Sequence, residues 1–511
     1  MPVSPEAPRW IVIGGGIAGL ATAARLRSAG FAVTLLERHA HLGGKIRTVP
    51  SPAGPIDAGP TVLTMRHVFD DLFACLGERI EDHVTLIKQN TVARHFWPDG
   101  SNLDLCADHT ANIDAIRDFA GEKSAKQFAA FHTRTQALFS AFDAPMMQAA
   151  EPHLPTLVKT TLANPSLIPA MAPLSTLRRA LRRSFDDPRL AQLFGRYATY
   201  VGGSPTHAPA LLSLIWQSEA QGVWVVKGGM HKLATALAAQ LQSHGVTIHT
   251  NAHVAGIATQ TGRVTAVALA DRRHLPCDGL VYAGDPRALA TGALGPDVAH
   301  IAPQTVRADR SFSARVHSFA ATPSGPELAH HNVFFDTDPV SEFNDLMAGR
   351  IPADPTLYLC ALDRGQSPNV PQLERFEIIS NAPATDGTDP PKDLDAWHQQ
   401  IMARMARFGM SFSPTPGPNT VTTPQSFAQM FPASQGALYG QTPHGLTASL
   451  NRPRARTSIP NLYLAGGGTH PGAGVPMATL SARHAAEAIL SDQTSMLRSA
   501  QMAMPGGMST A

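Results

Sequence analysis

The sequence contains little that would indicate a metal site, a disulfide framework or a nucleic-acid partner. Only four of its 511 residues are cysteines, Cys75, Cys106, Cys277 and Cys360, and no two of them stand at a metal-ligand spacing. Lysine and arginine together number 41 against 39 aspartates and glutamates, which leaves a net charge of +2. We therefore expect four reduced cysteines, no bound metal and no nucleic-acid partner.

Long apolar segments are also scarce. The first nine residues lack the basic region and apolar stretch of a secretory signal. The one run that approaches a membrane span, Trp10 to Ala24, is better explained as a strand followed by a glycine turn. We expect a cytoplasmic chain without a transmembrane helix. Its length and 43% hydrophobic content predict two or three interleaved domains.

A glycine-rich turn stands close to the N-terminus. An apolar run ends in Gly14, Gly16 and Gly19, and a helical pattern follows at once. Gly14 permits the sharp turn, Gly16 lets backbone N–H groups approach a pyrophosphate, and Gly19 lets the helix pack on the strand. Glu37 follows a second apolar strand at the distance where a ribose-binding carboxylate is needed. This pattern predicts a dinucleotide-binding βαβ unit for an unphosphorylated ribose.

The residues after Glu37 indicate which dinucleotide binds. A second glycine pair followed by a basic residue, Gly43 to Lys45, resembles the extended FAD fingerprint of amine oxidases and phytoene desaturases. Residues 56–61 resemble the segment that passes beside the flavin ring in those flavoproteins. We therefore predict FAD as the cofactor.

A second glycine loop lies near the C-terminal end. Residues 461–483 read as a strand, a glycine loop and a helix of small residues, which would place another helix N-terminus against the flavin. Gly467 stands where many relatives carry an acidic residue for the ribityl chain, so backbone N–H groups must make that contact. His470 lies in this loop, where an acid/base or cation-stabilising role competes with a helix-capping role.

The segment 144–184 is rich in Pro, Met, Leu and Ala, and it reads as short helices ending in a basic cluster. Two interpretations remain open for that cluster, which consists of Arg178, Arg179, Arg182 and Arg183. It suits an interfacial anchor whose guanidinium groups meet lipid phosphates, and it equally suits the solvated face of a core helix.

Further along the chain, Trp216, Trp224 and Met230 have two interpretations: the wall of a tunnel for a long apolar substrate, or ordinary core residues. Asp285 ends a buried strand, where we expect a helix cap rather than a catalyst.

The complete pattern resembles a known family. Residues 469–476, Thr-His-Pro-Gly-Ala-Gly-Val-Pro, look like the signature of bacterial carotenoid desaturases related to phytoene desaturase, and the N-terminal block agrees. Residues 57–66, 200–205 and 222–224 most closely resemble the 1-hydroxycarotenoid 3,4-desaturases, which are also called methoxyneurosporene or hydroxyneurosporene dehydrogenases.

The resemblance implies an α/β fold: a Rossmann-like FAD-binding domain, an interleaved α+β substrate domain and a helical subdomain that associates with membranes. The expected segments are 1–70, 226–300 and 441–493 for FAD, 71–143 and 301–440 for the substrate, 144–225 for the helical subdomain and 494–511 for a disordered tail. The expected FAD contacts are Gly14, Gly16, Ile17, Ala18, Gly19, Glu37, Arg38, Gly44, Lys45, Gly59, Pro60, Thr61, Val254, Gly466, Gly467, Gly474, Val475, Pro476 and Met477.

The resemblance also implies the reaction: FAD-dependent C3–C4 desaturation of a long acyclic 1-hydroxy or 1-methoxy carotenoid such as 1-hydroxyneurosporene. The enzyme would be peripherally associated with the inner or intracytoplasmic membrane, with oxygen or a quinone as electron acceptor. Three alternatives stay open: a phytoene desaturase making neurosporene or lycopene, an amine oxidase-like flavoenzyme, and a carotenoid isomerase or carrier without redox chemistry.

Overall fold

The computed structural model describes residues 6–385, 393–445 and 447–502, and its centre is a five-stranded parallel sheet in the order β20-β13-β1-β2-β9. These strands are drawn from three distant parts of the chain. They are β1 (Arg9–Ile13), β2 (Ala32–Leu36), β9 (Thr247–His249), β13 (Gly279–Tyr282) and β20 (Leu462–Leu464). Because β1 is central, the turn that follows it opens at the middle of the sheet's carboxyl edge, where dinucleotides bind in such folds.

The two faces of this sheet are covered differently. Alternate residues of β1 point to opposite sides, so that Val12 joins the core beneath the helices and Ile11 joins the core beneath a small antiparallel sheet. The helices are α1 (Ile17–Ser28), α2 (Arg66–Ala74), α9 (His231–Ser243) and α15 (Val475–Met502). The small sheet is β10 (Val254–Gln260), β11 (Arg263–Leu269) and β12 (His274–Pro276), with α10 (Arg287–Ala290) and α11 (Gln304–Arg307) beside it.

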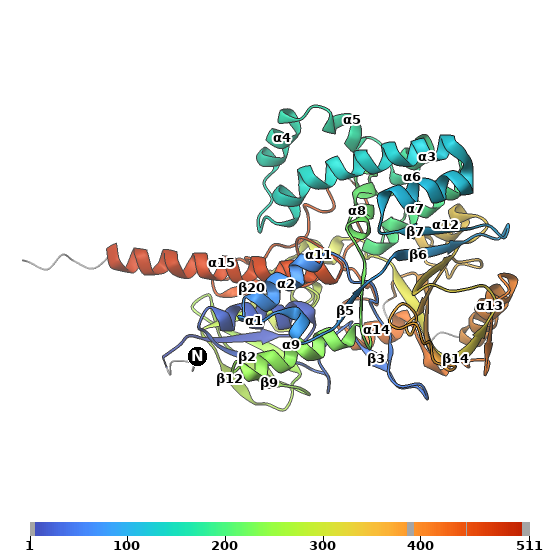
Figure 1. The fold of residues 1–511 in the computed structure, drawn as a ribbon. Coiled ribbons are helices and arrows are strands. Elements are labelled where there is room, and N and C mark those ends of the chain that lie inside the picture. Colours follow the sequence, from blue (N-terminus) through green and yellow to red (C-terminus); the bar gives the residue numbers. More distant parts are fainter. Residues whose placement is uncertain (1–5, 386–392, 446, 503–511) are drawn as a thin grey trace, which may run out of the picture.

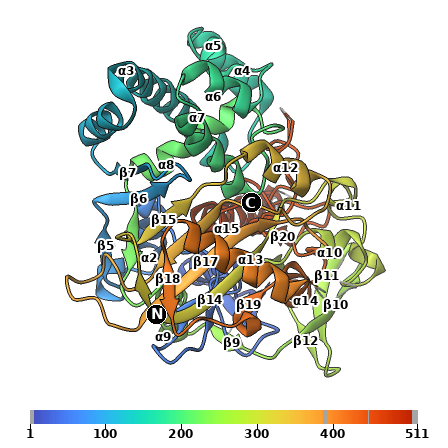
Figure 2. The same ribbon diagram turned by 90° about the vertical axis from the view of Figure 1, so that its right-hand side faces the viewer.

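A second, larger sheet forms the right-hand side of the molecule in Figure 1. Its path is β18-β14-β17-β16-β15-β6-β7, with β19 paired to β14. The strands are β6 (Thr91–Phe96), β7 (Asn102–Cys106), β14 (Ser313–Ser324), β15 (His331–Phe334), β16 (Leu357–Ala361), β17 (Glu374–Ala382), β18 (Ser411–Ser413) and β19 (Val421–Thr422). Helix α13 (Leu394–Arg407) packs Trp397 and Ile401 on the outer face, toward the viewer in Figure 2. Helix α14 (Pro424–Met430) instead packs Phe427 against Ala314 and Val316 on the opposite face. The rest of the opposite face is left free to form a binding site.

Short elements join the two sheets. The ribbon β3 (Thr48–Val49) with β4 (Ile56–Asp57) and the pair β5 (Leu86–Lys88) with β8 (Trp224–Val226) lie between them, and α12 (Pro339–Met347) follows β15.

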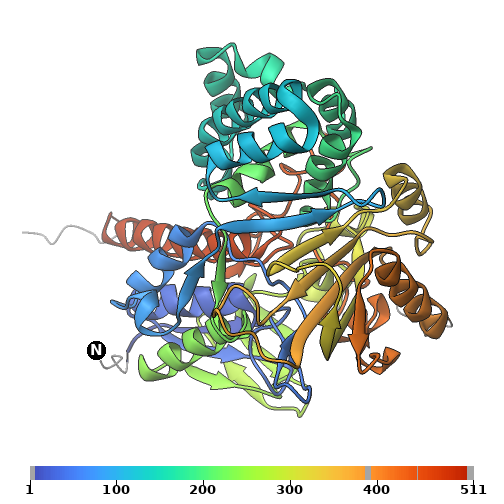
Figure 3. The ribbon, with the colours of Figure 1, turned by 45° about the vertical axis from the view of Figure 1, so that its right-hand side comes forward.

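A helical cap stands above the blue strands β6 and β7 in Figure 3. It consists of α3 (His109–Phe142), α4 (Leu154–Ala163), α5 (Leu167–Met171), α6 (Leu177–Ser184), α7 (Pro188–Gly195), the 3-10 turns η3 (Arg196–Val201) and η4 (Ala210–Ile215), and α8 (Trp216–Ala220). Helix α3 kinks at Gly121, where φ is 85°. The cap therefore begins at His109, within the segment 71–143 that the sequence analysis assigned to the substrate domain.

The end of the chain differs from its prediction. We expected a disordered tail from Thr494, but α15 continues to Met502, and residues 503–511 lie outside the described residues. The first part of α15 is held by packing on α1, through buried residues that include Ala482, Ala485 and Ile489. The helix continues beyond these residues to Met502. No helix among the described residues is both long and apolar enough to cross a membrane.

Candidate active site

One cavity of about 1320 Å³ runs from the carboxyl edge of the parallel sheet to the free face of the larger sheet. The turns after β1, β2, β13 and β20 form one end, and strands β14 to β17 with helix α7 form the other. A volume above the usual range for one small ligand leaves room for a cofactor and a substrate together.

The glycine turn has the geometry that its sequence predicts. Gly14 has a φ of 106°, and its N–H donates to the Leu36 carbonyl at 2.8 Å. A Cβ on Gly19 would lie 1.8 Å from the Gly14 carbonyl oxygen, whereas one on Gly16 would meet nothing closer than 3.8 Å. Gly19 thus serves the contact between α1 and β1, and Gly16 leaves open space at the helix N-terminus.

Glu37 is buried at the end of β2, and its carboxylate faces this turn. One oxygen accepts from the Gly15 N–H at 2.6 Å and the other from the His39 N–H at 2.8 Å. Both contacts fix the carboxylate where a ribose would lie, and each oxygen keeps room for a second hydrogen bond.

The structure brings nearly all of the predicted FAD contacts to this cavity. Those that line it are Gly14, Gly16, Ile17, Ala18, Glu37, Arg38, Gly44, Lys45, Gly59, Pro60, Thr61, Val254, Gly466, Gly467, Gly474, Val475, Pro476 and Met477. Gly19 does not line it, because its role is to let the helix approach the strand. A glycine turn at a helix N-terminus, a fixed carboxylate and a second glycine loop fit FAD.

Two cations, the half-buried Lys45 and the buried Arg452, hold the loops around the cavity. Lys45 donates from Nζ to the Leu438 carbonyl at 2.5 Å. The Arg452 guanidinium donates to the carbonyls of Tyr439, Gln441 and Gly467 at 2.8–3.1 Å. Arg452 therefore joins the loop 439–441 to the glycine loop after β20, and burial lowers its pKa to about 10.

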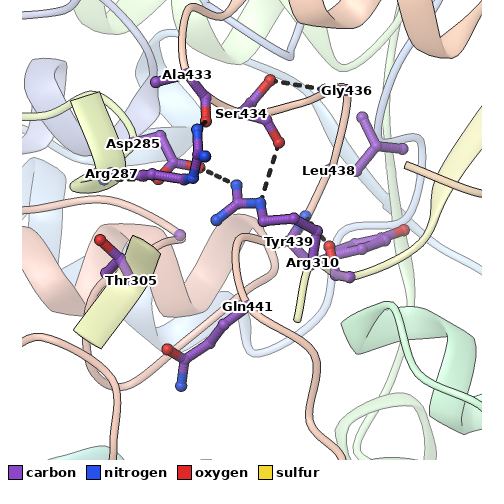
Figure 4. A network of polar contacts seen from close by, with 12 residues as sticks. Asp285, Arg287, Thr305, Arg310, Ala433, Ser434, Gly436, Leu438, Tyr439 and Gln441 are labelled. Atoms are coloured by element: carbon purple, nitrogen blue, oxygen red, sulfur yellow. Dashed lines mark hydrogen bonds and ion pairs between the residues drawn. The ribbon is translucent and has the colours of Figure 1, made fainter. Parts of the chain in front are cut away.

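Asp285 caps a helix, as predicted, and also anchors an ionic network (Figure 4). Its Oδ1 accepts from the Arg287 N–H at 3.0 Å, and Oδ2 pairs with Arg310. Arg310 also donates to the Ser434 carbonyl at 3.1 Å. The network links β13 of the FAD-binding sheet to the start of β14 and to the loop 433–441.

The free face of the larger sheet presents a row of mainly apolar side chains. Val333, Tyr358, Ile379 and Val316 are neighbours across four successive strands, and all four line the cavity. The Tyr358 hydroxyl lies 2.6 Å from the Thr61 hydroxyl and 2.6 Å from His331 Nδ1. This contact connects the sheet to the segment predicted to pass beside the flavin.

His470 does not reach the cavity. Its Nε2 lies 2.9 Å from the Ala149 carbonyl and its ring stacks on His484, with 4% of the residue exposed. Pro471, the next residue, does line the cavity. The catalytic role considered for His470 therefore has no support in the geometry, which assigns it to the contact between the glycine loop and the helical cap.

Of the two interpretations of Trp216, Trp224 and Met230, the tunnel wall is wrong. Trp216 is fully buried among Phe128, Phe194 and Tyr197. Neither Trp216 nor Trp224 nor Met230 lines the cavity. Arg178 and Arg182, in contrast, do line it.

Four further residues line the cavity that were not among the predicted site residues: Arg196, Glu219, Tyr358 and Arg452. A usable signal existed for Arg196 and Glu219, because each is a lone charge in an apolar segment that the fold buries. Tyr358 and Arg452 depend on contacts between distant segments.

The comparisons with known proteins agree with this geometry. The family model described as flavin containing amine oxidoreductase matches residues 17–490. The chain belongs to this family. It is an FAD-dependent oxidoreductase, which confirms the predicted cofactor and the α/β fold.

Curated relatives match over almost the whole chain. Hydroxyneurosporene desaturase of Cereibacter sphaeroides is 52% identical, covering 96% of this chain and 99% of its own, and that of Rhodobacter capsulatus is 50% identical, covering 95% and 98%. Among solved structures, wild-type putrescine oxidase bound to putrescine matches with a TM-score of 0.62 at 13% identity, covering 96% of this chain and all of its own. The last likeness shows the fold alone.

We expect Lys45 to make the enzyme sensitive to mildly alkaline pH. Burial lowers the pKa of Lys45 to about 8, while Asp285 raises it in part and Arg310 lowers it further. The ammonium is therefore lost as pH rises through about 8, and with it a positive charge next to the site for an anionic cofactor. We expect turnover to fall with an apparent pKa near 8. In Lys45→Arg, which stays protonated, a pH–rate profile should show the decline at least one unit higher; identical profiles would exclude Lys45 as the group that titrates.

Proposed function

We propose that this enzyme introduces the C3–C4 double bond into acyclic 1-hydroxy or 1-methoxy carotenoids such as 1-hydroxyneurosporene. The observation that carries the proposal is the near full-length likeness, at 50% and 52% identity, to two proteins named hydroxyneurosporene desaturase. A large cavity with an apolar row on the sheet is consistent with a long polyene.

In the proposed arrangement, FAD lies along the cavity with its pyrophosphate at the N-terminus of α1. Glu37 binds the adenosine ribose, and Val254 lies against the adenine. Residues 59–61 and 474–477 hold the flavin ring, with Lys45 at its edge. The open space at Gly16 and the burial of Glu37 support this assignment.

Bound FAD supplies the hydride acceptor for the reaction. The protein excludes water with Val316, Val333 and Ile379 and holds the C3–C4 bond in one orientation. Two hydrogens leave the C3–C4 unit, one of them as hydride. The other leaves as a proton from a carbon next to a delocalised cation, so that a strong base is not required. This agrees with the location of His470 outside the cavity.

Expression in two bacterial strains tests the proposal. One strain makes 1-hydroxyneurosporene and the other makes only phytoene, and the pigments are compared by chromatography and absorption spectra. We expect a 3,4-didehydro product in the first strain and unchanged phytoene in the second. Desaturation of phytoene would assign the enzyme to the phytoene desaturases instead, and unchanged pigments with FAD bound would reject both.

The proposed substrate partitions into membranes, and the helical cap carries an apolar surface suited to reaching it. Leu154, Val158 and Leu162 lie on one face of α4 and are 53–67% exposed; Ile168 and Leu174 are 44% and 91% exposed nearby. Arg179, Arg182 and Arg183 are exposed on the neighbouring helix. We propose that this surface binds the inner or intracytoplasmic membrane from the cytoplasmic side.

Serine at positions 154, 158 and 162 should weaken binding to anionic vesicles by about tenfold or more, because three apolar side chains no longer enter the acyl region. Co-sedimentation measures the effect. The matched control carries serine in place of Val306, Met347 and Val370, which are 41–45% exposed on other parts of the surface. Equal binding by both triple variants would reject α4 as the contact.

Oxygen or a membrane quinone is the electron acceptor that we propose for the reduced cofactor. The sequence shows one dinucleotide fingerprint, which FAD occupies, and a quinone is reachable from a membrane-bound position.

A further inference from the structure

A buried charged cluster of the helical cap lies at the cavity wall, and we call it the Arg196 cluster: Arg196, Tyr197, Tyr200 and Glu219. Arg196 Nη1 donates to the Tyr200 hydroxyl at 2.5 Å. The hydroxyls of Tyr200 and Tyr197 each donate to one Glu219 oxygen at 2.6 Å. Arg196 Nη2 lies 3.8 Å from Glu219, so the charges balance within the cluster.

The cluster is buried yet faces the cavity. Arg196 is 9% exposed and Glu219 is 3% exposed. Arg196, Tyr200 and Glu219 line the cavity, whereas Tyr197 stands behind them. The cluster thus presents a polar surface among apolar neighbours such as Val333.

Arg196 has hydrogen-bonding capacity left over. Within the described part of the chain, neither its Nε nor its Nη2 has a hydrogen-bond acceptor, although both are buried. A guanidinium carries five N–H donors, and leaving buried donors unpaired is unfavourable. Arg196 therefore combines donors that the described part of the protein leaves unpaired with a position on the cavity wall.

A second polar group on the cavity wall, around Glu342, differs in this respect. Glu342 Oε1 accepts from Asn381 at 3.1 Å, and Oε2 accepts from the Thr356 N–H at 3.2 Å. Both of its carboxylate oxygens have partners within the protein. Glu342 therefore gives no reason to expect a ligand.

The Arg196 cluster also lies close to the segment assigned to the flavin. The Trp224 N–H, at the start of β8, donates to the Leu63 carbonyl at 2.9 Å, which joins the segment that follows α8 to the residues after Thr61. Val62, Tyr200 and Tyr358 pack on the same apolar core, and Tyr358 contacts Thr61. In the proposed substrate only C2 separates the oxygen-bearing C1 from C3, so that a group binding this oxygen must lie near the reacting bond.

We propose that the Arg196 cluster binds the oxygen on C1 of the carotenoid, with Arg196 donating to that oxygen and so setting which bond faces the flavin. This inference rests on the proposed function. The Arg196 N–H can donate a hydrogen bond to a hydroxyl oxygen or to a methoxy oxygen. Glu219 can in addition accept a hydrogen bond from the substrate hydroxyl, since each carboxylate oxygen takes more than one hydrogen bond.

The test compares 1-hydroxyneurosporene with neurosporene, which lacks the oxygen, using FAD-loaded enzyme. We expect Arg196→Met to raise KM for the hydroxylated substrate about tenfold or more and to abolish its preference over neurosporene. KM or kcat for neurosporene should change little by comparison.

Two tyrosines provide a matched pair in case Arg196→Met folds poorly. Tyr200→Phe and Tyr197→Phe each remove a 2.6 Å hydrogen bond to Glu219, but only Tyr200 faces the cavity. We expect Tyr200→Phe alone to weaken the preference for the oxygenated substrate. Equal effects of the two variants, or a preference that survives Arg196→Met, would reduce the cluster to a structural brace and reject the inference. A wild-type enzyme that converts neither carotenoid would reject the proposed function itself, and the inference with it.

Discussion

Valine at position 19 should yield a protein that retains less than about a tenth of the FAD bound by the wild type. Any Cβ at this position would lie 1.8 Å from the Gly14 carbonyl oxygen and 3.0 Å from its carbon. Gly14 cannot yield, because its N–H is bonded to Leu36, and α1 is held from behind by α15. The helix must therefore move away from β1, which separates its N-terminus from the pyrophosphate position.

Flavin absorbance per protein after gel filtration measures this loss, and thermal unfolding shows whether the remaining fold survives. Ala29→Val, which adds similar bulk at the exposed end of the same helix, is the control and should bind FAD normally. A Gly19→Val protein with full FAD content would contradict the packing role assigned to this glycine.

Methionine in place of Arg452 should lower the free energy of unfolding by about 2–4 kcal/mol and weaken FAD binding. The guanidinium satisfies three carbonyls on two separate loops, and its removal leaves them without a donor. Relief of the buried charge offsets part of this cost, since burial already lowers the pKa of Arg452 to about 10.

Chemical denaturation with and without added FAD measures both effects. Arg454→Met is the matched control, because Arg454 is exposed and donates to one carbonyl, that of Pro152, at 3.2 Å. Equal losses in the two variants would show that Arg452 does not connect the loops as described.

The FAD half of the molecule could be predicted from the sequence because its signals are local. Two residues show this. Gly19 allows α1 to pack closely on β1, and Glu37 places a carboxylate at the end of β2, and the two stand at a fixed distance along the chain. Val254 was placed by resemblance, and the structure brings it to the same cavity.

The substrate half could not be predicted in the same way. The row of Val333, Tyr358, Ile379 and Val316 exists only through pairing between strands that are distant in sequence, and alternation alone does not reveal their neighbours. His470 lies beside a cavity-lining residue in the sequence, yet its ring turns toward Ala149. Local patterns therefore located the cofactor and failed to locate the groups around the substrate.

Anaerobic mixing of the FAD-loaded enzyme with 1-hydroxyneurosporene tests the central claim most directly. Flavin absorbance is followed while the pigment is extracted and identified. The account predicts bleaching of the flavin with one 3,4-didehydro molecule formed per flavin reduced. An oxidised flavin that persists while the carotenoid is bound or isomerised would contradict a desaturase and favour a carrier or an isomerase.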